Sequence, residues 1–225
     1  MNPTKPDYEA WKSEILARMD TSKTVLAIID MQRAFCSPDG ALAALGSDVS
    51  TSREVADRID EFLPKVREWL SSVTFFRLVY DPQFMSEAQK ERLIRNGRPI
   101  ICRPDDPGSD LVLAPQPQDP VFVKHRYSAF SNEDFCSMLE KHRISTVVVA
   151  GVDTHICIEG TVRDGYDLGY RMIVLSDLVG TRRSELSRHD YSLGLCDKYF
   201  GLSIESSRLL EVCAMNRRRQ LLSLV

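Results

Sequence analysis

One of the six cysteines, Cys157, stands where a protein could activate a nucleophile. It follows the β-branched run 146–152 by about five residues, where the next helix is expected to begin. A thiol there would face unpaired backbone N–H groups and the positive end of the helix dipole, which favour the thiolate. The same N–H groups could hold the oxyanion that forms when the sulfur attacks a carbonyl carbon. The position therefore indicates a cysteine nucleophile, and a buried structural cysteine is the alternative.

Asp30 and Lys124 stand at the ends of two other predicted strands. Asp30 closes the apolar run 24–30, and Lys124 closes the short run 122–124. Because the carboxyl ends of parallel strands meet at one edge of a sheet, we expect both side chains to lie near Cys157. Asp30 could accept the thiol proton or cap the following loop. Lys124 could pair with Asp30 or extend its ammonium group to solvent.

The histidines offer a second set of possibilities. His155 is two residues from Cys157 and suggests a Cys–His dyad, but neighbours on a tight turn usually point apart. The order Asp153-Thr154-His155 resembles part of a metal site, yet no third ligand can be assigned. His189 is expected on a solvated helix face. We therefore expect no metal and no cofactor.

Strand and helix patterns alternate along the chain. Apolar runs typical of strands lie at 24–30, 73–80, 122–124, 146–152, 172–177 and 202–204. Helices are predicted over 52–71, 86–95, 131–141, 156–168 and 184–198, followed by a C-terminal helix. This alternation predicts right-handed βαβ units, that is, an α/β fold with a mostly parallel sheet and helices on both faces.

Two segments fall outside this alternation. Residues 96–119 hold five of the eleven prolines and no clear periodicity, so we expect a long loop over the active-site end. Residues 1–20 are polar and amphipathic, which argues against a signal peptide and predicts an N-terminal helical extension. The length of 225 residues suits a single domain spanning 1–225.

Composition excludes several classes of protein. A hydrophobic fraction of 43%, a charged fraction of 27% and a net charge of -3 are typical of a soluble globular protein. The only basic run is 217–219, so nucleic-acid binding is not expected, and no apolar run reaches the roughly 18 residues of a membrane span. The cysteines form no CxxC pair, which favours reduced thiols in the cytoplasm. They are Cys36, Cys102, Cys136, Cys157, Cys196 and Cys213.

Three ordered motifs resemble the signatures of the isochorismatase-like cysteine hydrolases. The first is Ile28-Ile29-Asp30-Met31-Gln32 with Phe35. The second is Lys124-x-Arg126-Tyr127-Ser128-Ala129-Phe130. The third is Gly151-Val152-x-Thr154-x-x-Cys157-Ile158-Glu159-x-Thr161-x-Arg163-Asp164. The resemblance covers about residues 22–205, and the order and spacing of the motifs agree with the family.

The resemblance implies a fold and a set of catalytic residues. The fold would be a Rossmann-like three-layer α/β/α sandwich, and the catalytic triad would be Asp30, Lys124 and Cys157. The family also has an unusual cis peptide, which corresponds here to Val152–Asp153. This bond would direct the backbone N–H groups of Asp153 and Cys157 toward the oxyanion.

Departures from the family's patterns narrow the activity that the resemblance implies. Isochorismatases that cleave a vinyl ether lack the cysteine. The metal ligands of nicotinamidases, an Asp-x-His motif and a further histidine, have no counterpart here, because residues 50–100 contain no histidine. The segments 115–119, 126–128 and 159–165 most resemble the ureidoacrylate and biuret amidohydrolase branch. We therefore expect an amidohydrolase that cleaves a C–N bond of a small carbamoyl or amide substrate through a thioester.

The predicted substrate pocket and assembly complete this interpretation. Gln32, Phe35, Arg126 and Tyr127 are candidates for the pocket wall, with Arg126 available for a substrate carboxylate. A homo-oligomer is expected because relatives commonly assemble and because the C-terminal helix is rich in apolar residues, namely Leu209, Leu210, Val212, Leu221 and Leu222. Two alternatives stay open: a nicotinamidase-like or other hydrolase of the family, and a catalytically silent binding protein with this fold.

Overall fold

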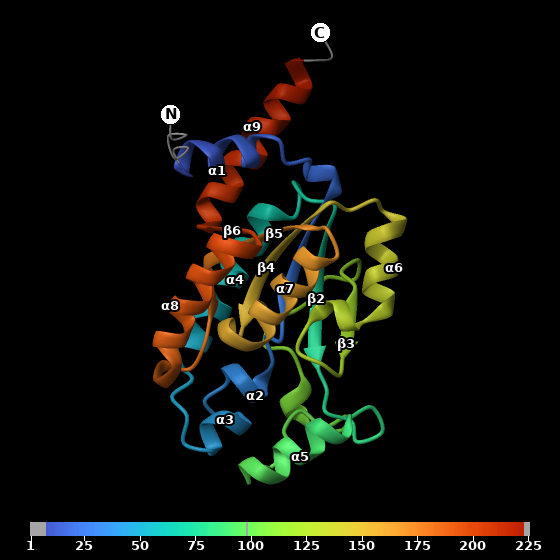
Figure 1. The fold of residues 1–225 in the computed structure, drawn as a ribbon, viewed down its shortest axis with the longest axis vertical. Helices are drawn as coiled ribbons and strands as arrows, with labels where there is room; N and C mark the ends of the chain where they lie inside the picture. Colours follow the sequence, from blue (N-terminus) through green and yellow to red (C-terminus); the bar gives the residue numbers. More distant parts are fainter. Residues whose placement is uncertain (1–7, 98, 223–225) are drawn as a thin grey trace, which may run out of the picture.

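The computed structural model describes residues 8–97 and 99–222, with side chains described as far as residue 218. Six strands form one sheet in the order β3-β2-β1-β4-β5-β6, and every neighbouring pair is parallel (Figure 1). The strands are β1 Thr24–Ile29, β2 Ser72–Leu78, β3 Val121–Lys124, β4 Thr146–Val152, β5 Arg171–Gly180 and β6 Leu202–Ile204. The parallel sheet confirms the predicted fold class.

The two central strands are buried on both faces. Every residue of β1 and of β4 is buried, which explains why their sequences are continuous apolar runs. Successive residues of a strand point to opposite faces, and β1 follows this rule. Leu26 and Ile28 enter one hydrophobic cluster, whereas Ala27 and Ile29 enter the other. The two clusters are the two interfaces of a three-layer sandwich.

Helices cover both faces of the sheet. The first cluster holds residues of α1 Tyr8–Ala17, α4 Ser50–Val66 and α9 Ser206–Leu222. The second holds residues of α6 Glu133–Lys141, α7 Glu159–Asp167 and α8 Leu186–Leu195. No helix of the described chain is long and apolar enough to cross a membrane.

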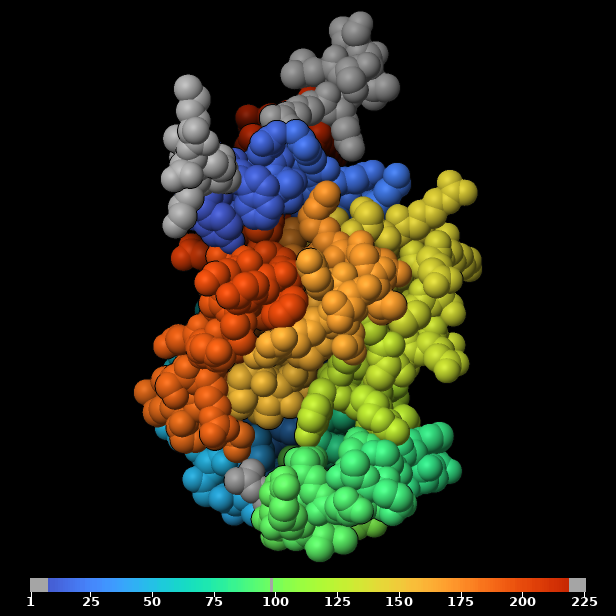
Figure 2. Space-filling view, viewed as in Figure 1, coloured from blue at the N-terminus to red at the C-terminus, as the bar shows by residue number. Residues whose placement is uncertain are grey.

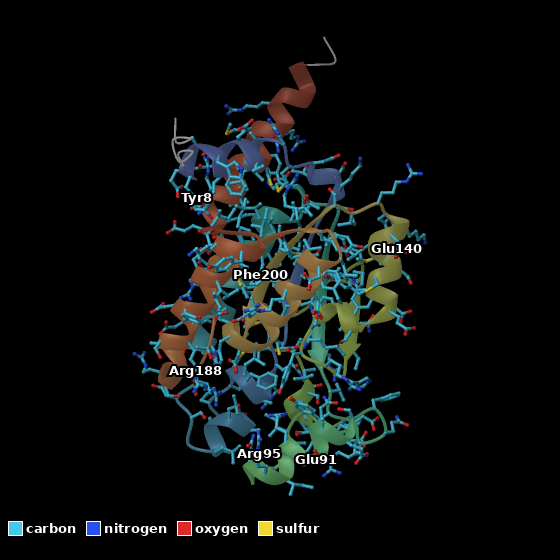
Figure 3. All side chains as sticks on the ribbon, in the orientation of Figure 1. Tyr8, Glu91, Arg95, Glu140, Arg188 and Phe200 are labelled. Carbon is cyan, nitrogen blue, oxygen red and sulfur yellow. The ribbon has the colours of Figure 1, made fainter. Side chains whose placement is uncertain are left out.

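Short helices gather at the carboxyl ends of the strands. In Figure 1 the strands point toward α2 Arg33–Cys36, α3 Ala41–Ala44 and α5 Glu87–Asn96. Figure 2 shows α5 and the chain before it as the lower end of the molecule, and Figure 3 labels Glu91 and Arg95 there. The sequence did not predict α2 and α3, because helices of four residues carry too little periodicity to detect.

Several predicted helices differ at their ends. The helix predicted over 156–168 begins with a π-helical turn, Thr154–Ile158, and α8 continues into a second one, Cys196–Phe200. Short 3₁₀ turns complete the chain: Thr21–Lys23, Pro107–Ser109, Ala129–Ser131 and Arg183–Glu185.

The first and last described helices, α1 and α9, lie at the end of the sheet opposite α5. In Figure 1, α1 and α9 meet there, and Asn216 Nδ2 donates to the Met19 carbonyl at 2.7 Å. In α9, Leu209 and Val212 are buried in the chain's own core. The argument for an oligomer from this helix is therefore weaker than its sequence indicates. Leu221 and Leu222, which also supported that argument, lie outside the described side chains.

Candidate active site

Asp30 is held at the carboxyl end of β1 in an unusual backbone conformation. Its φ is +52°, in the left-handed region, and its N–H donates to the Phe76 carbonyl of β2 at 3.1 Å. On the other side, Gly151 of β4 pairs with Ile29 and has φ +122°. A Cβ at Gly151 would stand 2.1 Å from the Ile29 carbonyl oxygen, so only glycine permits this close approach. Such strain is concentrated at functional sites.

Lys124 reaches Asp30 from the end of β3. Its Nζ donates to Asp30 Oδ2 at 2.7 Å, to the Tyr127 carbonyl at 2.8 Å and to the Arg126 carbonyl at 3.2 Å. These three acceptors satisfy the three ammonium protons, and the Lys124 side chain is fully buried. The alternative that Lys124 extends to solvent does not occur.

Cys157 stands in the π-helical turn that follows β4. The Val152–Asp153 peptide is cis, as the resemblance implied. Thr161 Oγ1 donates to the Cys157 carbonyl at 2.7 Å and accepts from the Ala129 N–H at 3.0 Å. Thr161 therefore joins the Cys157 turn to the chain that follows Lys124.

Burial dominates the electrostatics of the three groups. It raises the pKa of the Cys157 thiol well above its ordinary value; Lys124 opposes this shift and Asp30 adds to it. The predicted lowering of the Cys157 pKa by the helix terminus is therefore wrong for this structure, because desolvation outweighs it. Burial also raises the pKa of Asp30, against Lys124 and the thiol. Burial lowers the pKa of Lys124, but Asp30 and Cys157 together raise it by more. The net pKa is therefore above its ordinary value, and the ammonium group stays charged.

These pKa shifts indicate which of the groups carries a proton before substrate binds. The Cys157 thiol keeps its proton, and Asp30 is a stronger base than an exposed carboxylate. One oxygen of Asp30, Oδ1, is buried and accepts no hydrogen bond among the described residues, whereas Oδ2 is held by Lys124. Asp30 therefore has a vacant acceptor oxygen beside the cavity that it shares with Cys157.

Asp30 and Cys157 line a cavity of about 130 Å³ at the carboxyl ends of the strands. Phe35 and Tyr127, both predicted in the pocket wall, are part of its lining. The predicted loop 96–119 contributes Pro99 and Ile101, so it does cover this end of the sheet. The volume and the apolar wall suit a small substrate.

Comparisons with known proteins agree with this geometry. The Isochorismatase domain model matches residues 24–207. The chain is 33% identical over 173 residues to a ureidoacrylate amidohydrolase RutB of Methylorubrum extorquens, over 70% of each chain. It is 33% identical over 178 residues to a RutB of Pseudomonas syringae pv. syringae, over 71% of each chain. The chain belongs to the isochorismatase family.

Solved structures share the fold of this isochorismatase-family protein. A cysteine hydrolase from Pseudomonas syringae pv. phaseolicola superposes with a TM-score of 0.76 at 23% identity, covering 88% of this chain and 95% of the other. Nicotinamidase PncA from Bacillus subtilis superposes with a TM-score of 0.68 at 22% identity, covering 81% and 99%. Both likenesses concern the fold alone.

Two residues predicted in the pocket wall of this family member lie elsewhere. Gln32 is fully buried and clamps the end of β2: it accepts from the Leu78 N–H and donates to the Leu78 and Ser109 carbonyls. Arg126 is exposed and donates to the Phe84 carbonyl at 2.7 Å. In this structure Arg126 is not part of the cavity lining.

Of the two histidines near the site, His189 lies in a different environment from the one predicted. His155 does not line the cavity of Cys157; its Nε2 lies 4.0 Å from Glu185 Oε2. His189, predicted on a solvated face, is half-buried, and its Nδ1 forms a 2.8 Å hydrogen bond with Thr154 Oγ1. Burial lowers the pKa of both rings. Within the described chain, no three His, Cys, Asp or Glu side chains converge as metal ligands.

Sequence reasoning missed three polar side chains of the cavity: Tyr80, Arg92 and Arg182. Tyr80 and Arg182 each lie two residues beyond the end of a strand, β2 and β5. The strand-end rule that selected Asp30 and Lys124 could have found them. Arg92 lies on α5, and only the tertiary structure brings it to the cavity.

Proposed function

We propose that this protein is a cysteine-dependent amidohydrolase that cleaves the C–N bond of a small carbamoyl or amide compound. The observation that supports this most directly is the buried Asp30 carboxylate between Lys124 and the thiol of Cys157. Relatives that are 33% identical to this chain over about 70% of its length are named ureidoacrylate amidohydrolases. A fold kept only for binding has no physical need for a fully satisfied buried lysine beside an acid and a thiol.

The first half of the proposed reaction forms a thioester. Asp30 takes the thiol proton, and the sulfur of Cys157 attacks the carbonyl carbon. The backbone N–H groups of Asp153 and Cys157 hold the resulting oxyanion. The C–N bond breaks as protonated Asp30 returns its proton to the departing nitrogen, which leaves as ammonia or an amine. The acyl or carbamoyl group stays on the sulfur.

The second half releases the acid. A water molecule gives a proton to Asp30 and attacks the thioester carbonyl. The C–S bond then breaks, and Asp30 returns the proton to the sulfur. Lys124 keeps its proton throughout, because it balances the charge of Asp30 and holds the carboxylate in place. No metal or cofactor takes part, so turnover should survive treatment with EDTA.

The setting of this activity is also a proposal. We expect a cytoplasmic enzyme, because its thiols need a reducing compartment, and a homo-oligomer. Light scattering at micromolar concentration tests the assembly, and a monomeric mass would contradict the proposed homo-oligomer. The cavity volume favours a substrate of few heavy atoms over a macromolecule.

The decisive experiment combines turnover with detection of the intermediate. Ammonia release is measured with 3-ureidoacrylate, 3-ureidopropanoate, biuret and nicotinamide, for the wild type and for Cys157→Ala. Cys213→Ala is the matched control, because Cys213 is buried against α4 and the sheet, away from the cavity. We expect at least one compound to be turned over, Cys157→Ala to be inactive and Cys213→Ala to be nearly normal.

Mass spectrometry of acid-quenched protein should then detect the acyl or carbamoyl group on Cys157. Turnover of nicotinamide alone would assign the protein to the nicotinamidase-like alternative. No turnover, together with no adduct on Cys157, would favour a silent binding protein.

A further inference from the structure

Asp153 gives the cavity a second carboxyl group beside that of Asp30. Both residues line the cavity that holds Cys157, and they follow the ends of the neighbouring strands β4 and β1. The Asp153 carboxyl group is near enough to the thiol to raise the pKa of Cys157. The proposed reaction uses only the backbone N–H of Asp153, so its side chain has a place in the site but no role.

The two carboxyl groups have different partners. Lys124 Nζ lies 2.7 Å from Asp30 Oδ2, and this contact favours a charged carboxylate. Asp153 Oδ1 accepts from the neutral hydroxyl of Thr181 at 3.2 Å, and Oδ2 forms no hydrogen bond with the described residues. No cation of the described chain lies within 4.0 Å of the Asp153 carboxyl oxygens. Asp30 is therefore held as a base, whereas Asp153 can keep a proton on an oxygen beside the cavity.

The surroundings of Asp153 favour a neutral carboxyl group that can become charged. Burial raises its pKa and Asp30 adds to the shift, whereas Arg182 and His155 oppose it. Arg182 also lines the cavity, and its Nε is buried without a hydrogen-bond partner among the described residues, so it can stabilise the charge that appears when the proton leaves. A neutral carboxyl group beside the proposed oxyanion avoids the repulsion that a second anion would cause. The titratable groups that face Asp153 are Asp30, Cys36, His155, Cys157 and Arg182.

We infer that Asp153 is a further catalytic residue, the general acid that protonates the departing nitrogen. This inference rests on the proposed function for the reacting bond, and it transfers to Asp153 two proton transfers that the simpler scheme gives to Asp30. Asp30 takes the thiol proton as the sulfur of Cys157 attacks. Asp153 gives its proton to the nitrogen as the C–N bond breaks, and ammonia or an amine leaves.

The same two carboxyl groups complete the second half of the reaction. A water molecule gives a proton to the Asp153 carboxylate as its oxygen attacks the thioester carbon. The C–S bond then breaks, and Asp30 returns its proton to the sulfur. Asp30, Asp153 and Cys157 all end in the protonation states in which they began.

A comparison of two leaving groups tests the acid separately from the nucleophile. The amide that the wild type cleaves fastest is compared with the 4-nitrophenyl ester that puts the same group on Cys157. This ester is 4-nitrophenyl carbamate for the ureido compounds and biuret, and 4-nitrophenyl nicotinate for nicotinamide. Asp153→Asn should slow acylation by the amide by about 10² to 10⁴ and leave the burst of nitrophenolate within a few-fold, because nitrophenolate leaves without a proton. Asp30→Asn should slow both, and Asp167→Asn, at an exposed position, should slow neither.

The pH dependence gives a second readout. Asp153 must be protonated to act, and burial raises its pKa, so kcat/KM for the amide should fall as the pH rises through that raised value. Asp153→Asn should lack this alkaline limb. Infrared spectra of the free protein at pH 6 should contain the carbonyl band of a neutral carboxyl group, which Asp153→Asn removes and Asp167→Asn retains.

The outcomes distinguish this inference from the proposed function. Equal slowing of the amide and the ester by Asp153→Asn, an unchanged amide rate, or no carboxyl band lost in the variant would overturn the inference and leave the proposed function intact. If the wild type is acylated by the ester on Cys157 but cleaves no amide, the proposed function fails and the inference fails with it.

Discussion

Lys124 Nζ lies 2.7 Å from Asp30 Oδ2, and both side chains are at most 1% exposed, although 94 residues separate them in the chain. Each charge is acceptable in the protein interior only because the other is present. The pair also joins β3 to β1, two strands that are separated in the sheet by β2. The site and the stability of the fold are therefore coupled through one ion pair.

Removing one charge of this ion pair should lower the free energy of unfolding by more than removing both charges. Lys124→Met leaves the Asp30 carboxylate buried without its counter-charge, and we expect a loss of about 3–5 kcal/mol in the free energy of unfolding. The double variant Asp30→Asn with Lys124→Met should recover part of that loss. Urea unfolding of the wild type, both single variants and the double variant gives the coupling energy. Additive single effects would show that the pair does not act as a unit.

Asp30→Asn isolates the role of Asp30 as a base. The amide has nearly the same size but cannot take the thiol proton, so thioester formation should slow by about 10² to 10⁴. Because burial raises the pKa of Cys157, solvent can deprotonate the thiol only at high pH, and alkaline buffer should partly restore the variant's rate. Stopped-flow measurements from pH 6 to 10 test this. If His155→Ala abolished turnover while Asp30→Asn did not, His155 would be the base.

Gln32→Leu tests a residue that positions the site without lining it. The change leaves the Leu78 N–H and the Leu78 and Ser109 carbonyls without their buried partner. We expect a loss of about 2–4 kcal/mol in the free energy of unfolding and a lower kcat with an unchanged order of preference among substrates. Gln118→Leu, at an exposed glutamine, is the control. A changed preference among substrates would instead place Gln32 in contact with the bound molecule.

Asp153→Asn tests the cost of a carboxyl group beside the proposed oxyanion position. Burial raises the pKa of Asp153 above its ordinary 3.8, against Arg182 and His155, so the folded protein binds this proton more tightly than the unfolded chain. The free energy of unfolding should therefore fall as pH rises from 3.8 through the raised pKa. Asn removes this dependence and still accepts from Thr181.

The measurement for Asp153 is a comparison of unfolding free energies at pH 4.5 and pH 7.5. The stability of Asp153→Asn relative to the wild type should be greater at pH 7.5. Asp167→Asn, at an exposed position near the end of α7, should show no such change. An opposite sign for Asp153→Asn would mean that Arg182 and His155 outweigh the burial of this carboxyl group.

Local sequence was sufficient to predict the parallel sheet and to select the three proposed catalytic residues. A strand buried on both faces must be apolar along its whole length, so β1 and β4 could be recognised without any structure. Parallel strands present their carboxyl ends at one edge, which brings Asp30 and the turn of Cys157 together. Lys124 ends the run 122–124 and was selected by the same rule, and the family resemblance then implied its place in a catalytic triad.

Tertiary structure alone decided the protonation of the site and the wall of the cavity. Helix position predicts a lowered pKa for Cys157, but the layers that close over the thiol remove water and reverse the shift. Gln32 and Arg126 are polar residues of the catalytic motifs, yet Gln32 bonds to the end of β2 and Arg126 donates to the Phe84 carbonyl. Arg92 reaches the cavity from within α5 and not from a strand end. Desolvation and side-chain direction depend on elements distant in the chain, and no local pattern encodes them.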